Sequence, residues 1–418
     1  MRLNSIRVVV VLPLALSMAA IPLSPAAAAD VTISHWQHQS DARAKMVQEF
    51  ADSYGDAKID FQSIPYSSYF QKLGAALEAG NGPCVFQLPA NILAEFYKRG
   101  ELDPVPASIM STADIESTFT PASIKLLKID GSYYALPTDV QTFMLFYNDD
   151  LFKQAGLDPS KDFATWSDLV DAAKKLTTVE NGKMTQAGID IAASPYQWFY
   201  AVPTLAYADG LVNDTTGDIN YDSDPGYLAW DRITSLVAKD HVDDPQFLAE
   251  QSKFTIGKAA MTFKEFTFDG VYRLASDDLH FSVHPAPPFA DNAPGKVAST
   301  SWSYAVSSKC AVKDDAWKWV AYLTSEDAQK KWIAGGAELP SRIALLSDQT
   351  LQQDPNVAAG FKALQSAMPY DSKGWDDAYA IQQEIWDEIV LKGVDVKTAV
   401  DKGAADERAL YRSKGLLK

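Results

Sequence analysis

Hydrophobic residues in the first third of the chain switch repeatedly between the spacing of a strand and that of a helix. Short apolar or alternating runs at 31–35, 59–61 and 84–88 have the length and composition of strands. Between them, apolar residues recur every three or four positions across 42–54 and 69–77, which predicts two helices. This strand-helix-strand-helix-strand order predicts a parallel sheet covered by helices, and such sheets bind ligands at the carboxyl ends of their strands.

The rest of the chain repeats this mixture of strands and helices. Thr165, followed by Asp168, has the pattern of a capping box and predicts a helix that runs to Leu176. Residues 302–306 predict a strand and residues 314–323 a helix. The sequence contains no internal repeat and no flexible linker. We therefore expect two lobes joined by a chain that crosses between them more than once.

The first segment, Met1–Ala29, has the three parts of a secretory signal peptide. Arg2 and Arg7 form its charged end, an apolar stretch follows from Val8 to Ala20, and small residues precede a cleavage site before Asp30. The apolar stretch is shorter than the roughly 20 residues of a membrane span. We expect this segment to be removed on export, which places the mature protein in the periplasm.

Composition narrows the possible partners. The length of 418 residues suits two or three domains of roughly 150 residues each. The 37 basic and 54 acidic side chains give a formal net charge of −17. A surface this acidic repels nucleic acids and anionic lipids. We therefore expect a soluble monomer with no nucleic-acid partner.

Sequence signatures of catalysis and metal binding are missing. No nucleophile elbow, zinc-protease motif, phosphate-binding loop or Cys-x-x-Cys pair is present. The run from Asp218 to Asp224 starts like a calcium loop, but Ser223 and Ala229 stand where glycine and glutamate are required. His35 and His38 have no matching metal ligands elsewhere in the sequence. We therefore predict no catalytic residue, no metal and no cofactor.

Aromatic residues are abundant where loops are expected. The chain has 10 tryptophans and 18 tyrosines. Flat rings cover the C–H face of a sugar, while amide and carboxylate groups satisfy its hydroxyls. Aromatic and short polar residues together at strand-to-helix loops therefore favour a carbohydrate ligand. The aromatic residues at such positions are Trp36, Tyr66, Tyr196, Trp198, Trp302 and Trp375.

Five segments, taken in order, resemble the carbohydrate-binding members of extracellular solute-binding family 1, the group that includes maltose-binding protein. The segments are 66–82 followed by Pro-Cys-Val, 134–155, 254–261, 314–323 and 335–342. The resemblance runs from Val31 nearly to the C-terminus. A departure is Cys84, where many relatives have aspartate before the third strand.

The resemblance implies an α/β, two-lobed periplasmic-binding-protein fold of the class II type, in which each lobe is a mostly parallel sheet flanked by helices. Hinge strands cross between the lobes. Residues 30–139 and 298–345 would form lobe 1, and residues 140–297 and 346–418 lobe 2. A sugar or oligosaccharide would bind between the lobes, and hinge closure would signal its presence to the permease subunits of an ABC transporter in the inner membrane.

Ligand-binding residues are expected in loops from both lobes. Residues 36–41 follow the first strand, residues 87–91 follow the third, and residues 139–141 lie on a crossing strand. The residues carried over by position are Trp36, Gln37, His38, Asp41, Gln87, Asn91, Asp139, Gln141, Tyr196, Trp198, Glu265, Phe266, Trp302, Arg342 and Trp375.

The resemblance also bears on the two cysteines. In this fold the third strand lies beside an antiparallel strand that returns late in the chain. Cys84 begins the first of these strands and Cys310 ends the second, so we predict a disulfide between them. Two small buried thiols are the alternative.

Two further interpretations of the function remain. The same fold binds anionic ligands, such as a glycerol phosphodiester or an acidic or sulfonated sugar, in some relatives. His38, Lys264 and Arg342 would supply donors for such a ligand. A secreted glycoside-acting enzyme needs only two suitably spaced carboxylates, which the sequence does not exclude.

Overall fold

The computed structural model describes residues 31–38, 41–191, 212, 218–249, 251–290, 296–336, 338–373 and 375–417; the side chains of residues 41, 42, 336, 375 and 376 are outside this description. The expected signal peptide and the aromatic positions Tyr196 and Trp198 lie outside the described residues. No helix in the described ranges is long and apolar enough to cross a membrane.

The first lobe is built on a five-stranded sheet with the order β2-β1-β3-β13-β6. β1 runs parallel to β2 and β3, whereas β13 runs antiparallel to β3 and β6. The predicted strand-helix-strand-helix-strand order is confirmed. The strands are β1 (Thr32–Gln37), β2 (Lys58–Ser63), β3 (Val85–Pro89), β6 (Leu136–Pro137) and β13 (Trp302–Val306), with β4 (Lys128–Ile129) and β5 (Ser132–Tyr133) as a separate hairpin.

Helices from both ends of the sequence cover this sheet and share one hydrophobic core with it, in which Trp317 and Trp319 are fully buried. The helices are α1 (Asp41–Ser53), α2 (Tyr66–Ala79), α3 (Leu93–Lys98), α4 (Thr112–Thr118), α5 (Pro121–Ile124), α11 (Lys313–Leu323) and α12 (Glu326–Gly336), with short 3-10 turns at Ala90–Ile92 and Lys125–Leu127.

The second lobe is built on β7, a strand whose ten residues are all buried. Phe143, Leu145 and Tyr147 pack into one core, while Met144 and Phe146 pack into another. Successive side chains of a strand point to opposite faces, so both faces of this sheet are covered. The strands are β7 (Asp139–Asn148), β10 (Met261–Glu265), β11 (Phe281–His284), β12 (Val297–Thr300), β14 (Leu339–Pro340) and β15 (Ala367–Pro369), with β8 (Thr178–Glu180) and β9 (Lys183–Gln186) as a hairpin.

The helices of the second lobe lie on both faces of its sheet. The helix predicted at 165–176 is confirmed as α7, and both hydrogen bonds of the Thr165–Asp168 capping box are present. The helices are α6 (Asp149–Gln154), α7 (Trp166–Leu176), α9 (Asp224–Ala238), α10 (Phe268–Ala275), α13 (Pro355–Leu364), α14 (Trp375–Val390) and α15 (Val396–Ser413), with 3-10 turns at Ile343–Ser347 and Leu351–Gln353.

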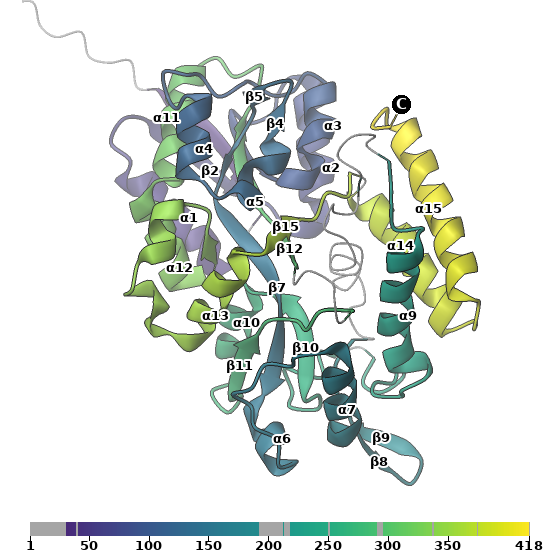
Figure 1. Cartoon of the computed structure of the whole chain (residues 1–418). Coiled ribbons are helices and arrows are strands. Elements are labelled where there is room, and N and C mark those ends of the chain that lie inside the picture. The colour runs from purple at the N-terminus through teal and green to yellow at the C-terminus, as the bar shows by residue number, and fades with distance from the viewer. Residues whose placement is uncertain are drawn as a thin grey trace, which may run out of the picture.

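Crossing segments join the lobes through the middle of the molecule, where Figure 1 shows β7 and β12 between the part with α2 to α4 and the part with α6 and α7. The chain passes from β6 directly into β7, and from β12 directly into β13. Gln141 pairs with Thr300, and β14 adds a third segment beside Asp139. The expected crossing strands are thus present.

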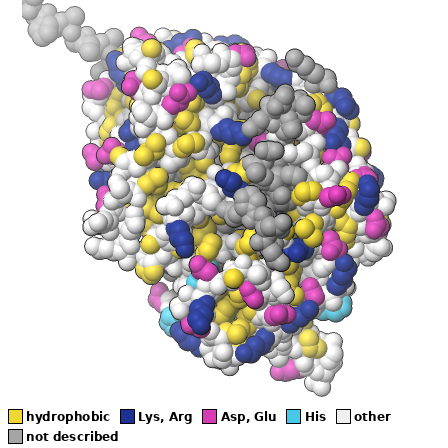
Figure 2. Space-filling view, viewed as in Figure 1, with side chains coloured by type: hydrophobic (Ala, Val, Ile, Leu, Met, Phe, Trp, Pro, Cys, Tyr) yellow, Lys and Arg dark blue, Asp and Glu magenta, His cyan; other side chains and the backbone are white. Residues whose placement is uncertain are grey.

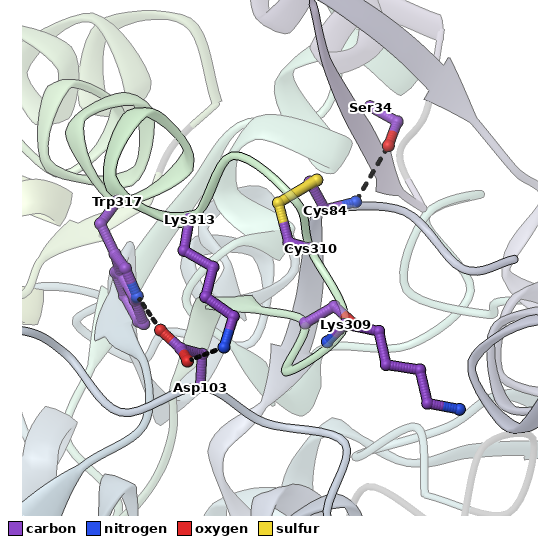
Figure 3. Close-up of a disulfide and its surroundings, with 8 residues drawn as sticks. Ser34, Cys84, Asp103, Lys309, Cys310, Lys313 and Trp317 are labelled. Carbon is purple, nitrogen blue, oxygen red and sulfur yellow. Dashed lines mark hydrogen bonds and ion pairs between the residues drawn. A yellow bond between two sulfur atoms is a disulfide. The ribbon is translucent and has the colours of Figure 1, made fainter. Parts of the chain in front are cut away.

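A disulfide between Cys84 and Cys310 joins the start of β3 to the chain just after β13, with the two Cα atoms 4.8 Å apart. Val306 pairs with Val85, so the antiparallel register brings the cysteines to the same edge of the sheet. Figure 3 shows Asp103 close by, where it accepts hydrogen bonds from Lys313 at 2.6 Å and from the indole of Trp317 at 3.0 Å.

The acidic run at 218–224 has a structural role. Arg408 of α15 makes ion pairs of 2.7 Å with Asp218 and with Asp222. Its guanidinium also donates to the carbonyl of Ile219 at 2.9 Å. Arg408 therefore occupies two of the three aspartates in the segment that looked like a calcium loop. Within the described ranges, no group of three or more His, Cys, Asp or Glu residues is arranged to hold a metal.

Candidate functional site

The carboxyl end of β1 presents Trp36, Gln37 and His38. Gln37 is fully buried, and its Oε1 accepts a hydrogen bond from the hydroxyl of Tyr304 at 2.7 Å. This bond fixes the orientation of the amide, so Nε2 is the free end. Among the described residues, this Nε2 atom has no hydrogen-bond partner.

His38 lies in a cluster of rings. Its ring centroid is 4.3 Å from that of Trp302, 4.9 Å from that of Tyr66 and 5.7 Å from that of Tyr69. Burial, assisted by the charge of Arg43, lowers the pKa of His38 to about 4. The imidazole is therefore neutral at neutral pH.

The carboxyl end of β3 is tied to that of β1 by Tyr69. Its hydroxyl accepts from the backbone N–H of Gln87 at 3.0 Å and donates to the carbonyl of the same residue at 2.8 Å. It also lies 3.1 Å from the carbonyl of Trp36. The side chain of Gln87 is buried, and its Oε1 has no partner in the described part of the chain.

The crossing strands contribute a pair of carboxyl groups. Asp139 accepts hydrogen bonds from the amide of Gln141 at 2.9 Å and from the backbone N–H of Trp302 at 2.8 Å. Glu265, at the end of β10, accepts from the hydroxyl of Thr300 at 2.6 Å. Burial is the main cause that raises the pKa of both carboxyl groups. Both groups are thus held in place by hydrogen bonds from the crossing strands.

The site includes an ion pair that the sequence did not indicate. Arg43 of α1 lies 2.8 Å from the carboxylate of Glu338, just before β14, and its guanidinium also donates to the hydroxyl of Thr267. Burial raises the pKa of Glu338, although Arg43 opposes the shift. These contacts link α1 of lobe 1 to Thr267, which directly precedes α10 of lobe 2. No local sequence pattern marks them, because the residues come from distant parts of the chain.

Four predicted site residues share one property: each has a buried polar atom with no hydrogen-bond partner in the described part of the chain. These atoms are Gln37 Nε2, His38 Nε2, Gln87 Oε1 and Gln141 Oε1. They come from the carboxyl ends of β1 and β3, which are neighbours in the first sheet, and from the start of β7, which pairs with β12. An unsatisfied buried polar group costs about 1–3 kcal/mol, and the hydroxyl groups of a ligand or an ordered water would supply the missing partners.

Two predictions are corrected by the structure. Phe266 is fully buried and packs against Leu339 and Phe361 in one of the cores of lobe 2, so it has a packing role. Arg342 donates to the carbonyl of Thr324 at 2.6 Å, and its guanidinium lies 5.1 Å from the ring centroid of Phe119. Both of these partners belong to the body of lobe 1, so Arg342 is occupied away from the ring cluster.

The other predicted positions divide into two groups. Asn91 follows β3 and reaches across to lobe 2, where its amide donates to the carbonyl of Ser372 at 2.8 Å. The remaining positions, which fall on residues or side chains outside the described part of the chain, are Asp41, Tyr196, Trp198 and Trp375.

The fold and this site define a two-lobed binding protein. The chain matches the model of the family described as bacterial extracellular solute-binding protein over residues 45–359. The chain therefore belongs to the bacterial extracellular solute-binding protein family, whose members are binding proteins that act outside the cytoplasm.

Individual similar proteins differ in the ligand that they are named for. A maltotriose-binding protein of Pyrococcus abyssi is 24% identical over 81% of this chain and 73% of its own. An sn-glycerol-3-phosphate-binding periplasmic protein of Salmonella typhimurium is 32% identical over 40% of this chain and 39% of its own. A solved structure of a solute-binding protein from Thermotoga lettingae, bound with α-D-tagatose, has a TM-score of 0.77 and 22% identity, and the match covers 91% of this chain and 99% of that one. The last similarity shows a shared fold.

Proposed function

We propose that this protein captures a neutral sugar or oligosaccharide between its lobes and delivers it to the permease of an ABC importer in the inner membrane. The observation that carries the proposal is the set of four buried polar atoms on Gln37, His38, Gln87 and Gln141 that have no partner among the described residues. The set includes a donor, two acceptors and an imidazole nitrogen that serves as either. Hydroxyl groups both donate and accept, so a polyhydroxylated ligand satisfies all four atoms.

The rings beside these atoms suit the apolar face of the same ligand. Trp302 lies between His38 and Phe70, whose ring is 6.4 Å away and nearly parallel to the indole, at 15°. Tyr66 is 45% exposed although it lies in this cluster, so its ring remains accessible. Aromatic faces next to hydrogen-bonding groups are the arrangement that a sugar ring requires.

The proposed mechanism requires no bond chemistry. Ligand contacts with β1 and β3 of lobe 1 and with the lobe 2 side of the cleft favour the closed state over the open state. A ligand shifts this equilibrium only by its higher affinity for the closed form. The strands that cross between the lobes provide the hinge, and the closed form is the one that the permease recognises.

An anionic ligand is the second candidate, because the glycerol-3-phosphate-binding relative shares part of the sequence. The three side chains expected to bind an anion, those of His38, Lys264 and Arg342, do not form a common anion site. His38 is neutral at neutral pH, and Arg342 is bonded within lobe 1. Lys264 is buried over the ring of Phe268, and burial lowers its pKa to about 8. The carboxyl groups of Asp139 and Glu265 also disfavour an anion.

Glycoside hydrolysis is the third candidate and needs two catalytic carboxyl groups. Both oxygens of Asp139 are occupied by hydrogen bonds that hold Trp302 and Gln141 in place. This arrangement favours a structural role for Asp139 over a nucleophilic one. We propose that the protein is not an enzyme.

A thermal-shift panel tests these candidates, with D-tagatose, maltotriose, mannotriose and sn-glycerol-3-phosphate as probes. A ligand at about 100 times its Kd stabilises the folded form by about 2.7 kcal/mol. We expect a neutral sugar to raise Tm equally at low and high salt, since screening acts only on charged ligands. A shift with sn-glycerol-3-phosphate alone, which falls with added salt, would instead establish the anionic ligand. Chromatography of the bound sugar after incubation tests for turnover, and recovery of intact sugar is expected.

Two organisational predictions remain part of the proposal. Residues 1–29 are proposed to be a cleavable signal peptide that directs the chain to the periplasm. Lobe 1 is proposed to comprise residues 30–139 and 298–345, and lobe 2 residues 140–297 and 346–418. The membership of β13 in the first sheet and of β7 in the second supports these boundaries. The segments 298–300 of β12 and 339–340 of β14, which the ranges assign to lobe 1, pair with β7 in the second sheet. The protein is proposed to act as a monomer.

A further inference from the structure

A cavity of about 420 Å³ lies beside the ring cluster. Most of its lining comes from α2, α3 and the chain around α3 in lobe 1, and lobe 2 contributes Asp377 of α14 and Lys414, directly after α15. Figure 1 shows α2 and α3 on the side of lobe 1 that approaches α14 and α15. The volume falls within the range of about 300–1,000 Å³ that is typical of small-molecule sites.

One face of α2 forms the first wall through Phe70, Gly74 and Glu78. These residues are four positions apart and therefore lie in line on the helix. Gly74 is the notable member, because a Cβ atom at this position would meet no atom within 4 Å apart from the adjoining backbone of its own helix and its chain neighbours. Glycine inside a helix costs about 1 kcal/mol relative to alanine. At this helix position the missing side chain leaves open space in the cavity.

The second wall is apolar at its base. Ile92 and Phe96 line it, and both are almost fully buried. The guanidinium of Arg99 lies 4.4 Å from the ring centroid of Phe96 and pairs with the carboxylate of Glu101 at 3.0 Å. The base of the cavity is thus an apolar and aromatic surface with paired charges at its edge.

Charged groups around the rim are also paired with one another. Lys414, near the C-terminus, lies 3.0 Å from Asp377 of α14 and 3.5 Å from Glu95 of α3. Counting Glu78 and Glu101, four carboxylates and only two cations line the cavity. An anion is therefore disfavoured, whereas hydroxyl groups can bond to both kinds of side chain.

Phe70 connects this cavity with the proposed sugar site, because its ring also stacks near that of Trp302, with 6.4 Å between the ring centroids. Ile92 adjoins Asn91, which bridges to Ser372 of lobe 2. A sugar ring held at the cluster of His38 and Trp302 would therefore have the cavity as its neighbour.

We propose that this cavity is a second sugar subsite, that the ligand is consequently an oligosaccharide of at least two rings, and that Gly74 provides the room for the second ring. The proposal rests on the proposed function, because it assumes that a sugar ring occupies the neighbouring cluster. The second subsite adds a preference for longer sugars, which the ring cluster of His38 and Trp302 alone does not require.

The test is a comparison of ligand lengths in a variant that fills the cavity. Leucine in place of Gly74 projects a side chain into the open space and has the higher helix propensity, so Gly74→Leu is expected to fold. Ala75→Leu is the matched control, since it adds a leucine to the exposed neighbouring position of the same helix. Calorimetry would measure the Kd of glucose, maltose and maltotriose, and of mannose, mannobiose and mannotriose, with melting temperature as a check on folding.

In the wild-type protein the trisaccharide of the bound series is expected to bind at least about tenfold more tightly than the monosaccharide, a difference of about 1.4 kcal/mol. Gly74→Leu is expected to reduce this ratio to less than about threefold, mainly by weakening the trisaccharide, while Ala75→Leu keeps the wild-type ratio. An unchanged ratio in Gly74→Leu, or a wild-type protein that binds the monosaccharide as tightly as the trisaccharide, overturns the subsite but leaves the sugar-binding function standing. If no sugar of either series binds but D-tagatose does, the subsite is overturned and the sugar-binding function stands. If D-tagatose also fails to bind, both are overturned.

Discussion

The backbone N–H of Trp302 donates a hydrogen bond of 2.8 Å to the carboxylate of Asp139, and this bond joins the start of β7 to the first residue of β13. The second carboxylate oxygen accepts from the amide of Gln141 at 2.9 Å. A single buried carboxyl group thus fixes both the indole that faces His38 and the amide that is offered to the ligand. The placement of Trp302 and Gln141 in the site therefore depends on a residue of the strand that crosses between the lobes.

Replacing this carboxyl group is expected to affect stability as well as binding. Asp139→Ala leaves the N–H of Trp302 and the amide of Gln141 without their acceptor, which is expected to lower the free energy of unfolding by at least about 2 kcal/mol. Urea unfolding measures the loss, and calorimetry is expected to show weaker sugar binding. Asp60→Ala, at an exposed position of β2, is the control and is expected to change stability by less than about 0.5 kcal/mol. Equal effects of the two substitutions would contradict the role of Asp139.

Gln87→Leu is expected to weaken ligand binding without lowering the free energy of unfolding. The backbone of Gln87 makes the bonds to Tyr69, while its side-chain Oε1 has no partner among the described residues. Leucine keeps a similar volume and removes a buried acceptor, so the unfolding free energy is expected to stay equal or to rise by up to about 1 kcal/mol. Ligand affinity is expected to fall about tenfold or more, because a hydroxyl loses its partner. A variant with unchanged affinity would remove Gln87 from the site.

His38 is expected to remain uncharged well below neutral pH. Burial lowers its pKa to about 4 from an ordinary value of 6.5, so its NMR resonances should not titrate between about pH 5 and pH 7. His280 is an internal comparison, because its hydrogen bond to Asp150 raises its pKa above the ordinary value. A titration midpoint of His38 near that of a free imidazole would contradict the buried position.

The same shift has a consequence for stability whose sign can be worked out. As the pH falls below 6.5, the unfolded chain gains a proton at His38 that the folded chain does not accept until about pH 4. The folded form therefore loses stability across this window, by at most about 1.4 kcal/mol per pH unit from this group. Asp139, Glu265 and Glu338 oppose this trend, since their raised pKa values favour the folded form at lower pH. Urea unfolding of the wild type and of His38→Gln at several pH values isolates the contribution of His38 to this pH dependence.

The disulfide is expected to contribute stability without contributing to binding. Cys84 and Cys310 close a loop of 226 residues in sequence, and loss of such a constraint typically costs about 2–5 kcal/mol. The double variant Cys84→Ser with Cys310→Ser, measured by urea unfolding, is expected to show this loss while sugar affinity stays unchanged. Thiol labelling of the unreduced, denatured wild type is expected to find no free cysteine. Two labelled thiols would refute the disulfide.

Lys414 is expected to stabilise the closed arrangement of the lobes, because it pairs with Glu95 of lobe 1 and Asp377 of lobe 2. Partly exposed ion pairs contribute up to about 1 kcal/mol, so Lys414→Gln is expected to weaken sugar affinity by at most about fivefold, with the difference shrinking at high salt. Lys402→Gln is the matched control: its partners Glu384 and Asp406 lie on α14 and α15, within one lobe. Identical affinities of the two variants would argue against an interlobe role.

Local patterns predicted the local structure well. Before residue 100, the spacing of apolar residues switches between that of a strand and that of a helix, and it predicted the order of β1 to β3 correctly. This was possible because each spacing depends only on neighbouring residues. The capping box at Thr165 and Asp168 foretold the start of α7 for the same reason. Among the site positions, His38 just after β1 and Gln87 near the end of β3 were predicted to lie at the carboxyl ends of their strands, and the structure places them there. Their contact with a ligand stays a prediction.

Contacts between distant parts of the chain could not be found this way. Glu265 and Phe266 are neighbours in sequence, yet Glu265 bonds to Thr300 of a crossing strand while Phe266 enters a hydrophobic core. Which of two adjacent residues turns inward depends on where β10 ends, and the sequence does not specify that. The pairing of Arg43 with Glu338 depends on the relative position of the two lobes, which no local pattern encodes.

The position of β13 within the first sheet determines when that sheet can be completed during folding. β13 lies between β3 and β6, so the first sheet has a gap until the chain has been synthesised beyond residue 306. During the proposed export, Cys310 follows Cys84 by 226 positions, so an interval separates the arrival of β3 in the periplasm from that of β13. Throughout that interval β3 exposes an unpaired edge that is prone to aggregation. A chaperone that covers this edge until β13 arrives would therefore have to stay bound for longer than in a protein whose lobes are encoded one after the other.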